Sequence, residues 1–346
     1  MPRLRTVAIA HDGFRPQPRR RWCAPPRLAL VNTRRGWTTN DIPDLTGLRA
    51  VVTGANSGLG LHTALELARH GAWVTMACRD EGRGQAALER VRAELEPGTG
   101  TAHLALLDLT DLESVRAFGA TWQGPLDVLV NNAGVMAVPY SVTVDGFERQ
   151  LGTNHLGHFA LTGLLLPALR SAPAARVVNV SSVGHRMGRI AFEDLQSERA
   201  YHRWGAYGQS KLANLLFTRE LARRLNRAGS TVCAAAAHPG TSDTELLTGF
   251  AGRSGPLAAV TRGFSRLGTQ SAAAGALPSL YAATMPDVVP ADYFGPDGLG
   301  EVRGTPTRVG MSAAARDAVV GRRLWQVSED LTGVAYDLPL DEEVLA

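Results

Sequence analysis

A tyrosine and a lysine four residues apart, Tyr207 and Lys211, have the types and spacing that acid–base chemistry requires. Apolar residues recur at helical spacing from 206 to 225, and a helix places such a pair on one face. A phenol has a pKa of about 10, and a nearby ammonium group favours the phenolate and lowers that pKa. The pair could therefore exchange a proton with a ligand near neutral pH.

The composition draws further attention to Lys211. It is the only lysine among the 36 lysine and arginine residues of the chain. A lysine ammonium is a compact point charge, whereas an arginine guanidinium is planar and forked. The single lysine in a chain that otherwise uses arginine suggests that this position requires the compact charge. An exposed lysine on an ordinary helix is the alternative interpretation, and the pair alone does not exclude it.

Length and composition are those of a folded globular protein. The chain has 346 residues, of which 45% are apolar and 20% charged. The net charge is +4, but residues 1–36 hold nine arginines and the single acid Asp12, so the remainder is slightly acidic. A nucleic-acid surface on the main body is therefore not expected.

The three cysteines are too dispersed for a disulfide framework or a zinc site. This distribution favours a reducing, cytoplasmic location. No apolar run reaches the roughly 18–20 residues that span a bilayer, so no transmembrane segment is expected. The histidines His155, His158, His185 and His202 show no convincing metal-binding spacing, and no metal site is predicted.

Residues 1–36, rich in arginine and proline, are expected to form a disordered extension. They lack the apolar segment of a signal peptide and the serines of a transit peptide. An RNA-binding arm and a start codon assigned too far upstream are the remaining interpretations, and we favour the second.

From residue 37 onward, expected strands and helices alternate. The strands are 49–53, 72–77, 103–107, 126–130, 176–180 and 231–236, and the helices are 61–70, 81–95, 111–122, 144–170, 206–227 and 312–324. This rhythm predicts a single α/β domain over 37–346, with a Rossmann-type doubly wound parallel sheet and helices on both faces. The Gly/Ala/Ser-rich segment 241–285 is expected to be a lid over an apolar ligand.

The first strand–helix turn carries Gly54, Gly58 and Gly60. Glycines there let backbone N–H groups approach a pyrophosphate at the N-terminus of the helix, which predicts dinucleotide binding. At the end of the second strand, Arg79 follows Cys78 where an NAD enzyme would carry a carboxylate. NADP(H) is therefore favoured over NAD(H); the alternative is a solvated Arg79 paired with Asp80.

The ordered motifs together resemble the short-chain dehydrogenase/reductase family. They are Thr53–Gly60, Asn131–Gly134, Asn154, Ser182, Tyr207 with Lys211, and Pro239 with Gly240. The runs 179–183, 192–196, 210–214 and 217–221 are similar to the retinol-dehydrogenase-like branch.

The resemblance implies roles for individual residues. Tyr207 would be the general acid/base, Lys211 would lower its pKa and bind the nicotinamide ribose, and Ser182 would orient the substrate oxygen. Asn154 would position a water that links Lys211 to solvent. The cofactor would contact Gly54, Asn56, Ser57, Gly58, Leu59, Gly60, Arg79, Asp108, Leu109, Asn131, Ala133, Gly134, Tyr207, Lys211, Pro239, Gly240 and Thr244.

The expected function is NADP(H)-dependent interconversion of an apolar alcohol and its aldehyde or ketone. Nothing in the residues selects a polyene, so retinoids themselves are not expected. The alternative is a cofactor-binding sensor without turnover, although a sensor does not need Ser182, Tyr207 and Lys211. A hydrolase based on Ser182 would lack the G-x-S-x-G turn. The family resemblance also allows a homodimer through helices 144–170 and 206–227.

Overall fold

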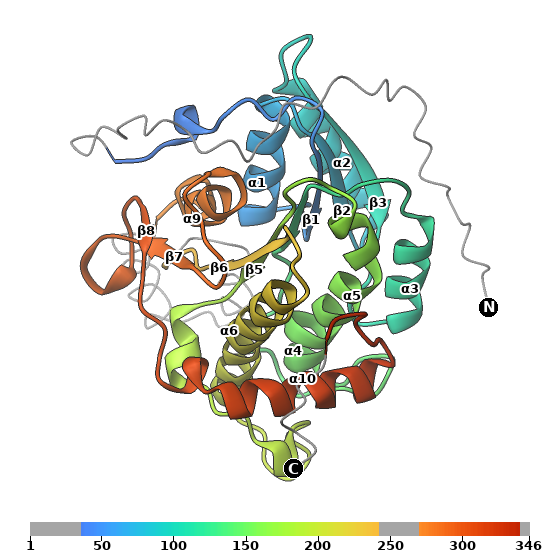
Figure 1. Cartoon of the computed structure of the whole chain (residues 1–346), viewed down its shortest axis with the longest axis vertical. Coiled ribbons are helices and arrows are strands. Elements are labelled where there is room, and N and C mark those ends of the chain that lie inside the picture. Colours follow the sequence, from blue (N-terminus) through green and yellow to red (C-terminus); the bar gives the residue numbers. More distant parts are fainter. Residues whose placement is uncertain (1–35, 242–269, 340–346) are drawn as a thin grey trace, which may run out of the picture.

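An eight-stranded sheet forms the centre of the protein, seen in a computed structural model that describes residues 36–241 and 270–339 (Figure 1). The strand order is β3-β2-β1-β4-β5-β6-β7-β8. The strands are β1 (Arg49–Thr53), β2 (Trp73–Cys78), β3 (Thr101–Leu106), β4 (Val128–Asn131), β5 (Arg176–Val180), β6 (Cys233–Ala237), β7 (Tyr293–Pro296) and β8 (Pro306–Arg308). All pairings are parallel except that of β7 with β8. The predicted doubly wound fold is confirmed.

Helices cover both faces of the sheet. They are α1 (Gly58–Arg69), α2 (Glu81–Ala93), α3 (Leu112–Thr121), α4 (Arg149–Leu151), α5 (Gly157–Arg170), α6 (Arg203–Arg227), α9 (Ala272–Thr284) and α10 (Ala318–Thr332). A π-helical turn, η2 (Gly152–Leu156), joins α4 to α5, and the 3-10 turns are η1 (Thr39–Asp41), η3 (Val183–Met187), η4 (Phe192–Asp194), η5 (Leu299–Glu301) and η6 (Ala314–Arg316). None of the helices among the described residues is long and apolar enough to cross a membrane.

Two hydrophobic cores lie on opposite faces of the sheet. In β1, Val51 belongs to the core formed with α3, α5 and α6, while Ala50 and Val52 belong to the core formed with α1, α2 and α9. Every residue of β1 is buried, as expected for a parallel strand covered on both sides. These cores hold the strand ends, and hence the loops that follow them, in fixed positions.

The C-terminal part of the predicted lid is instead a core helix. Within α9, Ala276 and Leu280 are completely buried, and the helix packs in the same core as α1. Gly275 and Pro278 weaken the helical signal in the sequence, and burial of the apolar face overrides that weak propensity. Residues 242–269 of the predicted lid lie outside the described residues, as do nearly all of residues 1–36.

Several helix boundaries also differ from the prediction, and hydrogen bonds at the helix start account for two of them. The helix expected from 144 begins at Arg149, because Val142 and Glu148 form an antiparallel bridge and the Glu148 carboxylate caps α4. The closing helix begins at Ala318, where Asp317 accepts hydrogen bonds from two backbone amides. The short strands β7 and β8 were not predicted.

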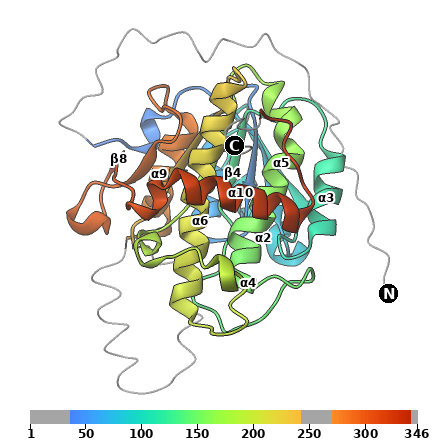
Figure 2. The same ribbon diagram turned by 60° about the horizontal axis from the view of Figure 1, so that its bottom comes forward.

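Helix α10 lies across α5 and α6 (Figure 2). Its Trp325 is 2% exposed and packs edge-on against Phe159, with 5.2 Å between ring centroids. The Arg224 guanidinium of α6 lies 4.4 Å from the same indole ring. Helix α10 therefore covers part of the surface of α5 and α6 through which a homodimer was expected to form.

Candidate active site

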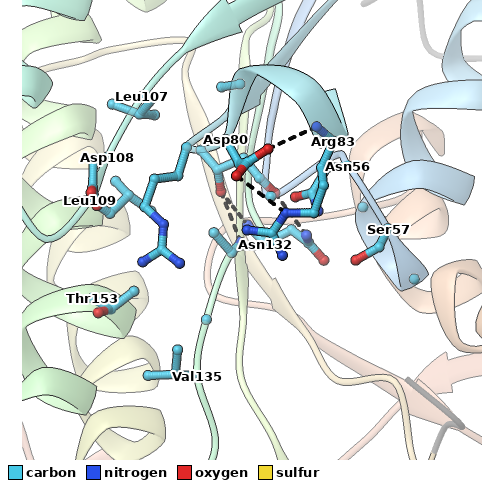
Figure 3. A pocket seen from close by; sticks show the side chains of 18 of the residues that line it. Asn56, Ser57, Asp80, Arg83, Leu107, Asp108, Leu109, Asn132, Val135 and Thr153 are labelled. Carbon is cyan, nitrogen blue, oxygen red and sulfur yellow. Dashed lines mark hydrogen bonds and ion pairs between the residues drawn. The ribbon is translucent and has the colours of Figure 1, made fainter. Parts of the chain in front are cut away.

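A cavity of about 290 Å³ opens at the carboxyl ends of the strands, where the order reverses between β1 and β4. Doubly wound sheets bind their ligands at this point. The lining residues come from the loops after four strands and from η2, and ten of them are labelled in Figure 3. They are Thr53, Gly54, Asn56, Ser57, Gly58, Leu59, Gly60, Ala77, Arg79, Asp80, Arg83, Leu107, Asp108, Leu109, Thr110, Asn132, Ala133, Gly134, Val135 and Thr153.

The glycine turn after β1 has the backbone geometry of an anion-binding loop. Gly54 and Gly58 have φ values of 65° and 53°, in the left-handed region that favours glycine. A Cβ on Gly60 would lie 2.4 Å from the carbonyl oxygen of Gly54, so this close approach also requires glycine. Helix α1 begins at Gly58, and its N-terminus faces the cavity. The turn can therefore receive a pyrophosphate.

The loop after β4 differs from the prediction in one residue. Asn131 is 1% exposed, and its amide nitrogen donates to Thr162 and Asn179, so it does not line the cavity. Asn132 lines it instead and donates to the carbonyl oxygen of Thr53 at 2.8 Å. Asn131 supports the groove from within the core. Asn132 directly follows Asn131 in the same motif, so the sequence did contain a signal for it.

Arg79, Asp80 and Arg83 lie together after β2 at one end of the cavity. The Asp80 carboxylate accepts a hydrogen bond of 2.8 Å from the backbone N–H of Arg83, capping α2, and lies 3.6 Å from the Arg83 guanidinium (Figure 3). Arg79 makes no ion pair within the described residues. Arg79 is exposed to solvent, as the alternative interpretation expects, but it forms no ion pair with Asp80 among the described residues. Arg83 is an additional cation that was not predicted.

The opposite wall follows β3. The Asp108 carboxylate accepts hydrogen bonds from the backbone and hydroxyl of Thr110, at 2.9 and 2.7 Å, which closes a tight turn. Leu109 presents an apolar surface to the cavity beside it. An adenine ring would fit between this wall and the arginines.

Asn154 lies in the π-helical turn and connects two parts of the site. Its side-chain oxygen accepts a hydrogen bond of 2.8 Å from the N–H of Val135, and its amide nitrogen donates to the Val135 carbonyl and to Ser210 of α6. A π turn redirects the backbone by one residue and is frequent at functional sites. It places Asn154 beside Gly134, where an added Cβ would lie 3.0 Å from the Asn154 oxygen.

Ser182 and Tyr207 come together just beyond the cavity. Ser182 follows β5 and caps η3 by accepting a hydrogen bond from Gly184 at 3.0 Å. A Cβ on Gly184 would lie 3.0 Å from the Tyr207 ring and 3.4 Å from the Ser182 hydroxyl oxygen, so both groups surround this glycine. Burial raises the pKa of Tyr207, and a hydrogen bond with Ser182 acts in the opposite direction.

Lys211 is buried on the same helix face, with an exposed fraction of 5%. Its ammonium lies 5.8 Å from the centre of the Tyr207 ring and donates to the Val180 carbonyl at 3.1 Å. Burial lowers the pKa of Lys211 to about 8. The ammonium is directed at the end of β5, and burial is the largest influence on the pKa of both Tyr207 and Lys211. That Lys211 lowers the pKa of Tyr207 stays a prediction.

The nicotinamide side of the predicted site is only partly described. Pro239 and Gly240 follow β6, and Gly240 has a φ of 65° with its Cα against the Val302 carbonyl. Neither residue is among those that line the cavity, and Thr244 lies outside the described residues. Across the described part of the chain, no group of histidine, cysteine and acidic side chains could hold a metal ion.

The residues present fit a dinucleotide. The cavity joins an anion-binding glycine turn, two cations, an apolar wall and, at Gly134, the buried Lys211. A Cβ on Gly134 would lie 3.5 Å from the Lys211 ammonium, which places Lys211 at the end of the groove.

Comparisons with known proteins agree with this geometry. The sequence profile of the family described as short chain dehydrogenase matches residues 49–252. Retinol dehydrogenase 12 of Mus musculus is 43% identical over 303 residues, covering 87% of this chain and 90% of that protein. Retinol dehydrogenase 14 of Mus musculus is 42% identical over 330 residues, covering 90% and 94%.

Solved structures show the same fold. An uncharacterized protein from Mycobacterium paratuberculosis is 48% identical, with a TM-score of 0.73 and coverage of 88% of this chain and 100% of that one. The RhlG/NADP active-site complex of Pseudomonas aeruginosa is 26% identical, with a TM-score of 0.57 and coverage of 72% and 94%. The chain thus belongs to the short-chain dehydrogenase/reductase family, in its retinol-dehydrogenase-like branch, and is an oxidoreductase that acts on CH–OH or C=O groups.

Proposed function

We propose that the protein reduces apolar aldehydes or ketones with NADPH, or catalyses the reverse oxidation, with Tyr207 as the general acid/base. The observation that carries this proposal is the position of Tyr207, buried between Ser182 and Lys211 at the end of the dinucleotide cavity. A bound nicotinamide would carry the hydride. The protein would orient the carbonyl and supply the proton that the product oxygen needs.

Each polar side chain has a separate task in this proposal. In the reduction, the Ser182 hydroxyl donates a hydrogen bond to the carbonyl oxygen, and the Tyr207 phenol transfers its proton there. Lys211 would bind the nicotinamide ribose and favour, through its charge, the phenolate that remains. Asn154 would position a water through which Lys211 exchanges a proton with solvent, so that the phenol is protonated again.

The preference for NADP(H) rests on charge. Arg79 and Arg83 approach the cavity at the predicted adenine end, and the Asp80 carboxylate is occupied as the cap of α2. Guanidinium groups suit a 2′-phosphate, whereas a ribose hydroxyl is normally bound by a free carboxylate. The related RhlG/NADP complex holds this cofactor in the same fold. The relatives named retinol dehydrogenase support an apolar substrate.

A cytoplasmic location is part of the proposal, supported by the small number and wide spacing of the cysteines in the sequence. The test of the whole proposal is NADPH oxidation across a panel of apolar aldehydes, ketones and quinones, with NADH assayed alongside. We expect turnover with at least one apolar carbonyl and a higher kcat/KM for NADPH. A higher kcat/KM for NADH would contradict the assignment of Arg79, and no turnover with any carbonyl or alcohol would contradict the enzymatic role.

A further inference from the structure

A group of titratable side chains lies behind Ser182 and has no part in the proton transfer described above. Arg186 comes from η3, which begins directly after Ser182, and His238 follows β6. Tyr293 comes from β7, and Glu301 from η5. His185, also in η3, donates a hydrogen bond of 2.7 Å from its Nδ1 to the Ser182 carbonyl and so belongs to the same group.

Glu301 contacts two of these segments at once. One carboxylate oxygen, Oε1, accepts a hydrogen bond of 2.6 Å from Nη2 of Arg186. The other, Oε2, lies 3.0 Å from Nε2 of His238, whose side chain is completely buried. Neither Oε2 nor Nε2 has another hydrogen-bond partner within the described residues, and their alignment is poorer than that of an ideal hydrogen bond. The pair is therefore a close electrostatic contact between two otherwise unsatisfied atoms.

The tautomer of His238 suits this contact. The backbone N–H of Gly240 donates to Nδ1 of His238 at 3.2 Å, so Nδ1 acts as an acceptor and the ring proton belongs on Nε2. Burial lowers the pKa of His238 to about 4, which keeps the ring neutral near pH 7. The Nε2–H group then lies beside the Glu301 carboxylate, and the imidazole carries no charge.

The backbone around Glu301 is also fixed. We refer to residues 297–305 as the strap. Asp297 closes it by accepting hydrogen bonds from the backbone and hydroxyl of Thr305, at 2.8 and 2.7 Å. Glu301 has a φ of 58°, an unusual value for a non-glycine residue that persists where surrounding contacts enforce it. Val302 accepts a hydrogen bond of 2.9 Å from Thr241, so the strap lies against the segment after β6.

We propose that Glu301 is a positioning residue of the active site. Its carboxylate holds the turn after Ser182, through Arg186, and the turn at Pro239–Gly240, through His238, at a fixed separation. The first turn orients the substrate oxygen and the second borders the nicotinamide under the proposed function, on which this inference rests. If either turn moved, the substrate carbonyl and the nicotinamide that donates the hydride would be misplaced relative to each other. The adenine end of the groove would not change.

The experiment compares Glu301→Ala and Glu301→Gln with Glu94→Ala as the matched control. Glu94 forms an ion pair of 2.5 Å with Arg69 on the surface, away from the cavity. Arg186 and His238 both present donors to Glu301, whereas a glutamine amide offers one acceptor and one donor. The kcat of Glu301→Gln should therefore lie between that of the wild type and that of Glu301→Ala. Each variant is measured for NADPH affinity, kcat and KM for the carbonyl, and the fraction of molecules that bind NADPH.

For Glu301→Ala we expect kcat per NADPH-binding molecule to fall roughly 10–100-fold, with NADPH affinity unchanged. Gly295→Ala gives a second test, because its Cβ would lie 2.0 Å from Nε2 of His238 and displace the ring, so it should show the same pattern. If Glu301→Ala does not fold, Glu301→Gln and Arg186→Ala take its place. A wild-type kcat per binding molecule in these variants would overturn the inference, whereas a wild-type protein without turnover would overturn the proposed function instead.

Discussion

The ammonium of Lys211 donates a hydrogen bond of 3.1 Å to the backbone carbonyl of Val180. Val180 is the last residue of β5, and Ser181 and Ser182 follow it. Asn214, one turn along α6, donates to the same carbonyl at 3.1 Å. The position of the buried ammonium is therefore set by the strand that carries Ser182, and Tyr207 lies beside it on the same helix.

Replacement of Lys211 by arginine should abolish most of the activity. A guanidinium is larger than an ammonium and would have to enter a site that is 5% exposed and close to Gly134. We expect kcat to fall by about 10²–10⁴-fold, the range for a lost acid–base group. Steady-state kinetics of Lys211→Arg would check this. Arg219→Lys, a partly exposed position on the same helix, should keep wild-type kinetics; an active Lys211→Arg would contradict the need for a point charge.

Cofactor preference should depend on Arg79. In Arg79→Ser, the lost contact to a 2′-phosphate should raise KM for NADPH about tenfold or more, the effect of one charged hydrogen bond. KM for NADH should change little. Arg90→Ser on α2, the helix that follows the Arg79 turn, is the control, since Arg90 does not line the cavity. Equal losses with both cofactors would show that Arg79 acts on protein stability rather than on the phosphate.

Stability should fall as the pH is lowered through the range of the buried histidines. Burial lowers the pKa of His155 to about 3, of His158 to about 4 and of His238 to about 4, from an unfolded value of 6.5. The unfolded chain thus binds more protons below pH 6.5, so the unfolding free energy is highest above that value and decreases toward pH 4. Urea unfolding measured from pH 7.5 to 4.5 gives the slope of the unfolding free energy against pH. This slope should be smaller in His155→Gln. An unfolding free energy that does not change over this pH range would contradict the conclusion that the buried imidazoles are neutral.

The packing of α10 predicts a large stability effect at one residue. Trp325 contacts Phe159, Phe217 and Tyr336, with ring centroids 5.2, 5.8 and 4.5 Å away. Trp325→Ala should lower the unfolding free energy by about 3–5 kcal/mol. Val319→Ala, on the exposed side of the same helix, should have little effect. A similar loss in both variants would show that this aromatic contact is not what fixes α10 on α5 and α6.

The strands and the reactive side chains could be predicted from the sequence because both leave local signals. Buried parallel strands appear as short apolar runs, and loops that approach a ligand carry glycines and polar residues at their start. The expected bounds of β1 and β5 agree with the structure at every residue, since each is a short run rich in valine that begins at an arginine. The glycine turn was placed correctly for the same reason.

Features that depend on contacts between distant residues could not be predicted. Helix α9 contains Gly275 and Pro278, and its stability comes from packing against α1. The direction of the Lys211 ammonium depends on Val180, thirty-one residues earlier in the chain. The occupation of Asp80 as a helix cap, and of Asn131 as a core residue, likewise required the tertiary structure.

The most direct test of the account is Tyr207→Phe, which removes the phenolic hydroxyl and keeps the buried ring. NADPH binding, followed by quenching of protein fluorescence, and turnover of the best carbonyl substrate should be measured on the same preparation. We predict unchanged NADPH affinity and a loss of kcat of about 10²–10⁴-fold, because only the proton donor is missing. Wild-type turnover in Tyr207→Phe would contradict the central claim that this phenol exchanges the proton with the substrate oxygen.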